Sequence, residues 1–285
     1  MATRTSKTNK KDPGAVEVAA VDRGEIGIWV LGESPIITNR MSQKAMRELL
    51  FPSPKMNAVE KRTHLKHHPI QEFRESPYII REDDSPTLIG LPATAFKGSM
   101  GTAALDLEGV KKAQVGRLVW VRGVYVPIWG IPEMFMAIVR QADMSRTPDV
   151  RTRAILPRWA AFLSITYIKP LMAHQAVANL LAAAGLTAGV GDWRPEKGKG
   201  NFGQFRLVNE DDPELLEIKK YGGREAQKKA LFAEHPKCFD DESDTLLSWF
   251  KEELERRKAA GNAPKKGRRG ETPIESDEVG IGASA

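Results

Sequence analysis

The chain has 285 residues, of which 41% are hydrophobic, 28% charged and 7% aromatic, and its formal net charge is +6. This composition excludes a wholly disordered chain, and the length suffices for one large domain or two small ones with a hydrophobic core. A single cysteine, Cys238, excludes an intramolecular disulfide framework and a cysteine-cluster zinc site, and is typical of a reducing cytoplasm. No apolar run approaches the ~20 residues that span a bilayer, and residues 1–12 lack the apolar core of a secretory signal. We therefore expect a cytoplasmic protein with no membrane partner.

The charge is distributed unevenly along the chain. Residues 13–209 hold 25 basic and 18 acidic residues, a net charge of +7, whereas residues 210–261 have a net charge of −4. A surface that binds a polyanion is therefore expected within residues 13–209, although a solvated surface with scattered charges explains the same numbers.

A flexible basic tail over residues 1–15 precedes the first predicted strand, residues 25–31, where isoleucine and valine alternate with glycine and tryptophan. Residues 42–50 are expected to form a helix. Residues 51–75 are rich in proline, lysine and histidine, and we interpret them as an inserted arm outside the core. A short strand is predicted over residues 77–81.

The next predicted helix begins at Thr94, which is suited to be its N-cap, and runs to about Leu107. Two strand-like runs follow at residues 117–121 and 124–128. A further apolar run at residues 133–141 leads into a predicted loop, residues 142–151.

A long strand is predicted over residues 158–168. The following helix, residues 173–184, has apolar residues at i, i+3, i+4 and i+7, and Gly185 suits the C′ position that would end it. A glycine-rich loop over residues 185–203 then leads to a short strand, residues 204–208.

Residues 210–260 are expected to form an acidic helical extension, and residues 261–285 a disordered tail. When insertions at about residues 33–80 and 130–153 are removed, the elements of residues 16–209 follow the order βαββαβ. This order is the ferredoxin-like plan of RNA-recognition modules, an α+β fold with an antiparallel sheet packed against two helices.

Two motifs occupy distinctive places in this plan. The stretch LPATAFKGSMGTAAL (residues 91–105) opens the first core helix, and GVGDWRPEKGKGNFGQFRL (residues 189–207) joins the second core helix to the last strand. Together, over roughly residues 25–208, they resemble the RAMP superfamily of CRISPR-associated proteins, and most closely the guide-RNA backbone subunits of the Cas-seven group. The Trp193-Arg194-Pro195 insertion and the acidic C-terminus depart from the usual pattern, as expected for a divergent or phage-encoded member.

The resemblance implies a ribonucleoprotein of antiviral defence, in which copies of the subunit oligomerise along a single-stranded guide RNA beside other effector-complex subunits. It also implies a basic groove and a thumb-like insertion between bases, which must come from residues 132–153 or 51–75. Some relatives cleave target RNA with an aspartate on the thumb loop. Asp143 and Asp149 occupy one of the two loops that could be this thumb, but no neighbouring residue marks either one as catalytic.

We predict that nucleic acid contacts basic and aromatic residues in and beside these motifs. Free backbone N–H groups at the helix start suit a phosphate, and the glycine-rich loop brings cations and two rings close to a ligand. The predicted contacts are Arg40, Lys44, Lys97, Arg151, Arg153, Arg158, Trp193, Arg194, Lys197, Lys199 and Phe202. Arg151 and Arg153 share a face at strand spacing. Each contact has a structural alternative: a solvated Lys97, arginines paired with carboxylates, and a Trp193 buried as a plug.

No cofactor or metal is expected. His64, His67 and His68 lie close in sequence but have no nearby cysteine and no convincing carboxylate partner at helical spacing, so a zinc site is not predicted. The leading hypothesis is a non-catalytic subunit that oligomerises on guide RNA. One rival is a single-stranded DNA-binding or annealing protein of a phage or mobile element. The other is a guide-processing endoribonuclease with His174 as general base.

Overall fold

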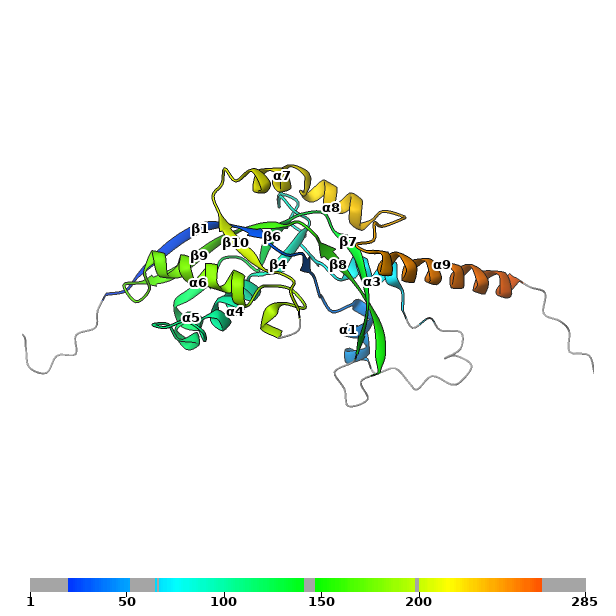
Figure 1. The fold of residues 1–285 in the computed structure, drawn as a ribbon, viewed down its shortest axis with the longest axis horizontal. Coiled ribbons are helices and arrows are strands. Elements are labelled where there is room, and N and C mark those ends of the chain that lie inside the picture. Colours follow the sequence, from blue (N-terminus) through cyan, green and yellow to red (C-terminus); the bar gives the residue numbers. More distant parts are fainter. Residues whose placement is uncertain (1–19, 52–64, 66, 141–146, 198–199, 263–285) are drawn as a thin grey trace, which may run out of the picture. The chain divides into compact units, whose positions relative to one another are not determined.

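The computed structural model describes residues 20–51, 65, 67–140, 147–197 and 200–262. Internal contacts divide the chain into two compact units, residues 1–244 and 245–285. The first unit combines helices with curled antiparallel sheets, which confirms the α+β class (Figure 1).

Two long central strands organise the larger sheet. Its spatial order is β10 (Phe205–Val208), β1 (Asp22–Gly32), β9 (Ala160–Lys169), β6 (Tyr125–Trp129), β4 (Ile89–Pro92) and β3 (Tyr78–Ile79), and β5 (Val119–Val121) also pairs with β9. β1 and β9 are antiparallel and pair without interruption from Asp22 opposite Lys169 to Leu31 opposite Ala160. Because side chains alternate between faces, Ile26 and Val30 point into the main core, whereas Trp29 lies on the other face.

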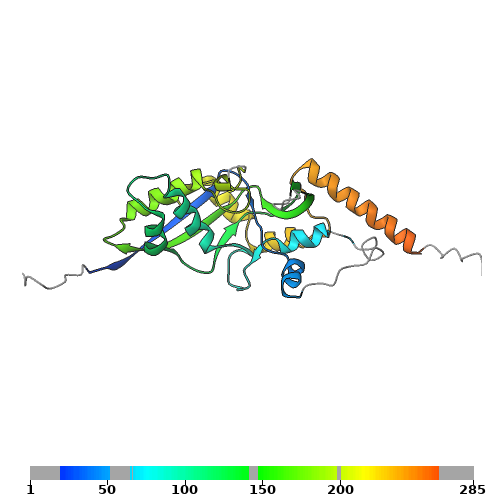
Figure 2. The same cartoon turned by 90° about the horizontal axis from the view of Figure 1, so that it is seen from below.

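Helices α4 (Ala93–Ala103) and α6 (His174–Thr187) cover the core face of this sheet (Figure 1, Figure 2). Phe96 of α4 and Phe205 of β10 are fully buried between the layers, with ring centroids 6.0 Å apart. The two helices also meet directly, because the Ser99 hydroxyl donates to the carbonyl of Ala184 at 3.3 Å. A shorter helix, α5 (Lys112–Leu118), packs beside α4.

Two helices after β10 pack on the opposite face of the sheet. Leu215 and Ile218 of α7 (Pro213–Tyr221) join Leu31 and Ala160 in a small core. In α8 (Arg224–Leu231), the buried Gln227 amide accepts hydrogen bonds from two backbone N–H groups and donates to two carbonyls, at 2.7 to 2.9 Å. All four hydrogen-bonding positions of this side chain are therefore satisfied, and they hold α8 against β4 and β6.

A second, smaller sheet contains β2 (Ile36–Ile37), β8 (Pro148–Leu156) and β7 (Glu133–Arg140), in that order. Helix α3 (Pro69–Glu75) packs against β8 and buries Phe73 completely. Helix α1 (Gln43–Leu50) begins after Ser42, whose hydroxyl accepts from the Ala45 N–H at 3.3 Å. The predicted helix at residues 42–50 is confirmed.

The second unit contains most of α9 (Asp241–Asn262), which begins at the end of the first unit. Glu253 accepts hydrogen bonds from Arg256 and Arg257, and these bonds lower the pKa of its carboxyl to about 2. The predicted tail at 1–15, most of the arm at 51–75 and nearly all of the tail at 261–285 lie outside the described residues. No helix in the described part of the chain has the length and apolar character needed to cross a membrane.

Two predictions about helix ends are wrong. Thr94 is not an N-cap, because α4 begins at Ala93, after Pro92, and Thr94 lies exposed inside its first turn. Gly185 does not end the second core helix, because α6 continues to Thr187. Gly185 instead permits close packing, since a Cβ atom there would lie 2.0 Å from the carbonyl oxygen of Phe205.

Three predictions about element type are also wrong. Residues 148–151 form the start of β8 instead of a loop, because they pair with β7. Residues 112–118 form helix α5, although the start of a strand was predicted at residue 117. Residues 69–75 belong to the packed structure rather than to an arm outside the core, as the burial of Phe73 shows.

The packing at Gly185 predicts an unusual response to substitution. Alanine favours a helix by about 1 kcal/mol over glycine, but at residue 185 its methyl group would force α6 away from β10. We expect Gly185→Ala to lower the free energy of unfolding by about 2 kcal/mol, measured by urea denaturation. Gly116→Ala in α5 is the matched control, because nothing lies within 4 Å of its added Cβ. It should raise stability by about 0.5–1 kcal/mol, and equal effects at both positions would contradict the packing argument.

Candidate nucleic-acid interface

The fold brings the two sequence motifs side by side. Thr102 near the end of α4 donates to the Glu196 carboxylate at 3.1 Å, although 94 residues separate them in sequence. Between α4 and the glycine-rich loop lies a cavity of about 460 Å³, which we term the first cavity. Its lining includes Gly98 of the first motif and the following residues from elsewhere: Asn39, Tyr78, Lys112, Gly191, Asp192 and Arg194.

The glycine-rich loop holds its position through backbone contacts that need glycine. Gly191 has φ +85°, and a Cβ atom there would lie 2.7 Å from the carbonyl oxygen of Ile37. The adjacent Asp192 N–H donates to that same carbonyl at 2.9 Å. Gly203, with φ +75°, donates to the carbonyl of Pro35 at 2.8 Å. The loop therefore lies directly on β2 and the residues before it.

A second cavity, of about 480 Å³, lies between the start of α1, residues 67–76 and strand β8. Three predicted contacts line it: Arg40, Arg151 and Arg153. Asn39 lines both cavities, and an ion pair joins Arg153 of the second cavity to Asp192 of the first. The two cavities therefore adjoin, and together we term them the Asn39 groove.

Carboxylates hold two of these arginines in place. Arg153 is about four-fifths buried beside Asp192. Burial, and secondarily the charge of Arg151, lowers the pKa of Arg153 to about 10, so its guanidinium stays protonated at neutral pH. Arg151, about half exposed, lies 3.1 Å from the buried carboxylate of Asp149. The side chain of Arg40 has no ion-pair partner among the described residues.

The second cavity also contains polar groups that are not among the predicted nucleic-acid contacts. His67 lies between two carboxylates, with Nδ1 3.0 Å from Glu72 and Nε2 2.9 Å from Asp149. Thr152 lines the cavity and is 5% exposed, and its hydroxyl is a buried side-chain group without a hydrogen-bond partner in the described structure. No sequence spacing connects residue 67 to residue 149, so only the fold reveals this cluster.

The remaining predicted cations occupy different surroundings. Arg194 lines the groove, but its guanidinium donates to Glu196 at 2.7 Å and to the Gly191 carbonyl at 2.8 Å. Lys97 lies outside the groove, with its ammonium 5.4 Å from the centre of the Trp120 ring. Lys197 is exposed on a 3₁₀ turn, Pro195–Lys197. The side chain of Lys44 and all of Lys199 fall outside the described structure.

The two aromatic residues predicted to stack on bases are partly buried and pack against a small core. The rings of Trp193 and Phe202 lie 5.6 and 6.2 Å from Phe135 of β7, in a small core with Ile37 and Ile155. Trp193 adopts φ 51°, which is uncommon for a residue other than glycine. These contacts match the structural alternative of a plug, and base stacking on either ring stays a prediction.

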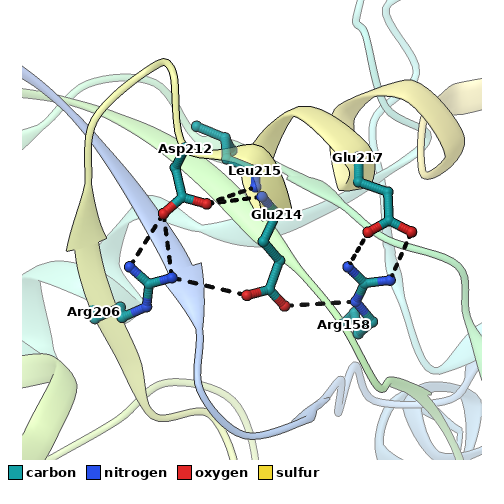
Figure 3. A network of polar contacts seen from close by, with 6 residues as sticks. All are labelled: Arg158, Arg206, Asp212, Glu214, Leu215 and Glu217. Atoms are coloured by element: carbon teal, nitrogen blue, oxygen red, sulfur yellow. Dashed lines mark hydrogen bonds and ion pairs between the residues drawn. The ribbon is translucent and has the colours of Figure 1, made fainter.

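Arg158 lies outside the groove and connects β9 to α7 (Figure 3). Its guanidinium donates twice to Glu217, at 3.1 and 2.6 Å, and lies 3.6 Å from Glu214. In the same network Arg206 bonds Asp212, whose carboxylate caps the start of α7 at 2.9 and 3.1 Å. Arg158 therefore pairs with carboxylates, as the alternative to a phosphate contact supposed.

His174, the residue weighed as a general base, lies away from the groove. His174 is exposed at the first residue of α6, whereas the glycine-rich loop follows its last residue, about 20 Å away along the helix axis. Its Nδ1 lies 3.4 Å from the Tyr167 hydroxyl. Asp149 is buried and bonded, and Asp143 and His64 fall outside the described structure. Among the described residues, no group of three or more His, Cys, Asp or Glu side chains is placed to hold a metal ion.

Comparison with known proteins adds no family assignment. A scan against models of protein families finds no match, and a search of the curated proteins finds no relative. The RAMP resemblance therefore depends on the two motifs and the order of elements.

The Arg158 network predicts a pH-dependent contribution to stability. Hydrogen bonding to Arg158 holds the pKa of the Glu217 carboxyl below its usual value. A carboxyl with a lowered folded-state pKa stabilises the fold above its unfolded pKa, and this contribution is lost as the pH falls through the folded pKa. Urea denaturation should show Glu217→Gln to be less stable than the wild type at neutral pH and equal to it in acid. A difference that persists in acid would contradict this assignment.

Proposed function

We propose that this chain is a RAMP-like, non-catalytic subunit that binds single-stranded nucleic acid and oligomerises along a guide RNA beside other effector-complex subunits. The observation that carries the proposal is the Asn39 groove. Arg40 was predicted from one part of the sequence and the pair Arg151 and Arg153 from another, and all three line this groove together with residues of both motifs. Guanidinium groups suit phosphates because their fork of donors matches phosphate oxygens.

The strand order supports a ferredoxin-like core. Along the chain, α6 connects β9 to β10, and α4 lies between β1 and β6. The spatial order of these four strands is β10-β1-β9-β6. This is the order expected of βαββαβ with every neighbouring pair antiparallel. We assign the thumb to the β7–β8 hairpin, because it belongs to a separate sheet and its strand β8 supplies Arg151 and Arg153 to the groove.

The groove suits a phosphate backbone better than a single small anion. Its cations are spread over two adjoining cavities, with Arg40 and Arg151 in one and Lys112 in the other. Asp149 and Asp192 fix the positions of two arginines and also neutralise part of their charge. We therefore expect moderate, salt-sensitive affinity that gains strength when many copies bind one strand. The endoribonuclease rival lacks support here, because His174 lies at the far end of α6.

Removal of two groove cations tests the proposal. The variant Arg40→Ala/Arg151→Ala should bind a fluorescein-labelled single-stranded RNA about tenfold more weakly and reduce the slope of log affinity against log salt by about 2. Fluorescence anisotropy measures both quantities. Lys228→Ala/Lys229→Ala is the matched control, since it removes two exposed cations of α8 and should leave affinity unchanged. Equal losses for the two double variants would reject the groove as the binding site.

Asp192 gives a test with opposite effects on stability and binding. Asp192→Asn removes the charge that neutralises Arg153 while it keeps the size of the side chain. We expect the free energy of unfolding to fall by about 1 kcal/mol, because a largely buried ion pair is lost. Affinity for the same RNA should rise, with a salt slope steeper by about 1, because Arg153 is released for a phosphate. Weaker binding in a folded Asp192→Asn protein is the result that would count against phosphate at this position.

A further inference from the structure

A second aromatic surface lies on the larger sheet, on the face opposite α4 and α6. Helix α7 packs over the part of this face near Leu31 and Ala160. Beyond α7 the face carries two rings that are each 40% exposed, Phe162 of β9 and Trp120 of β5. Trp120 pairs with Thr166 of β9. Thr166 lies an even number of positions, about 13 Å, from Phe162 along the same strand, so their side chains point to the same face. Trp120 and Phe162 therefore share a face of the sheet.

Phe162 has the setting of a stacking platform. Its ring lies over Gly27 of β1, where a Cβ atom would come within 2.6 Å of the ring. The absence of a side chain at Gly27 thus lets the ring lie against the backbone of the sheet. Trp29 supports the ring from the side, at a centroid distance of 5.2 Å, and Trp129 lies 5.1 Å beyond Trp29.

Cations accompany these rings. The ammonium of Lys219 lies 4.4 Å from the centre of the Trp29 ring. The ammonium of Lys97, which extends from α4 on the other face of the sheet, lies 5.4 Å from the centre of the Trp120 ring on β5. Arg122 lies next to Trp120 and pairs at 3.3 Å with Glu25, the acidic residue among these groups. Lys97 and Arg122 therefore lie beside Trp120 with one carboxylate, that of Glu25.

Further acidic residues border the other end of this surface, away from Glu25. A cavity of about 730 Å³ extends from Phe162 and Trp29 past the end of β10, where Glu210 and Asp211 are exposed. Those carboxylates would repel a phosphate backbone, whereas Arg122 and Lys97 on the opposite side would attract it. The distribution of charge thus favours a strand that runs past β5.

We propose that bases of the bound single strand stack on Phe162 and Trp120, as a second contact surface besides the Asn39 groove. This inference rests on the proposed function, since it assigns a further surface to the same ligand. Aromatic side chains accept the face of any base, so the surface adds affinity without reading sequence. It also gives Lys97 a place in binding that the groove does not provide. The contact is apolar, so its loss should lower affinity without a change in salt slope.

The test compares three variants of the full chain on a fluorescein-labelled single-stranded RNA. Phe162→Leu keeps an apolar side chain but has no ring, and should weaken binding roughly tenfold with an unchanged salt slope. Phe162→Tyr keeps the ring and should bind as the wild type does. Leu186→Ala, an exposed apolar residue of α6, is the surface control and should also bind normally. Circular dichroism melts confirm that each variant is folded.

The outcomes separate this inference from the proposed function. If the wild type binds the RNA and Phe162→Leu binds equally well, the stacking surface is rejected while the groove stands. If Phe162→Leu and Phe162→Tyr are weakened alike, the ring is not the contact and the inference is likewise overturned. If the wild type protein binds neither RNA nor the corresponding DNA, the proposed function itself fails.

Discussion

The structure depends on the contact between the glycine-rich loop and β2. Gly191 can approach the Ile37 carbonyl because it has no side chain and adopts a positive φ, and the Asp192 N–H closes a hydrogen bond to the same carbonyl. This contact links the larger sheet, whose β10 follows the loop, to the smaller sheet, which contains β2. It also places Asp192 beside Arg153 and thereby connects the two cavities of the Asn39 groove.

Four arginines illustrate two different roles. Arg158 and Arg206 bind carboxylates at the start of α7 and fix that helix on the sheet. Arg40 and Arg151 remain at the groove, one without an ion pair in the described structure and one held by Asp149. The position of α7 in turn leaves Phe162 and Trp120 exposed beyond it. The proposed phosphate and base contacts therefore both follow from how the sheets and α7 are held together.

Local sequence patterns predicted the elements whose periodicity is strong. The alternation around Ile28 gave the first central strand, and the helical spacing around Leu180 gave α6. The predictions failed where residues far apart in sequence determine the local structure. Strand β8 begins at Pro148 because β7 pairs with it. Gly185 lies within a helix, where its missing side chain makes room for Phe205. For the same reason the arginines of the groove were predictable one by one, but their pairing with Asp149 and Asp192 and the place of His67 were not.

The most direct measurement concerns what the purified protein carries. The full chain is purified at low salt, its ratio of nucleic-acid to protein absorbance is determined, and the bound material is treated separately with ribonuclease and deoxyribonuclease. The account predicts a high ratio, an assembly larger than a monomer on size exclusion, and bound strands of defined length that ribonuclease removes. A monomer free of nucleic acid would contradict the central claim, and bound material removed only by deoxyribonuclease would contradict the assignment to guide RNA.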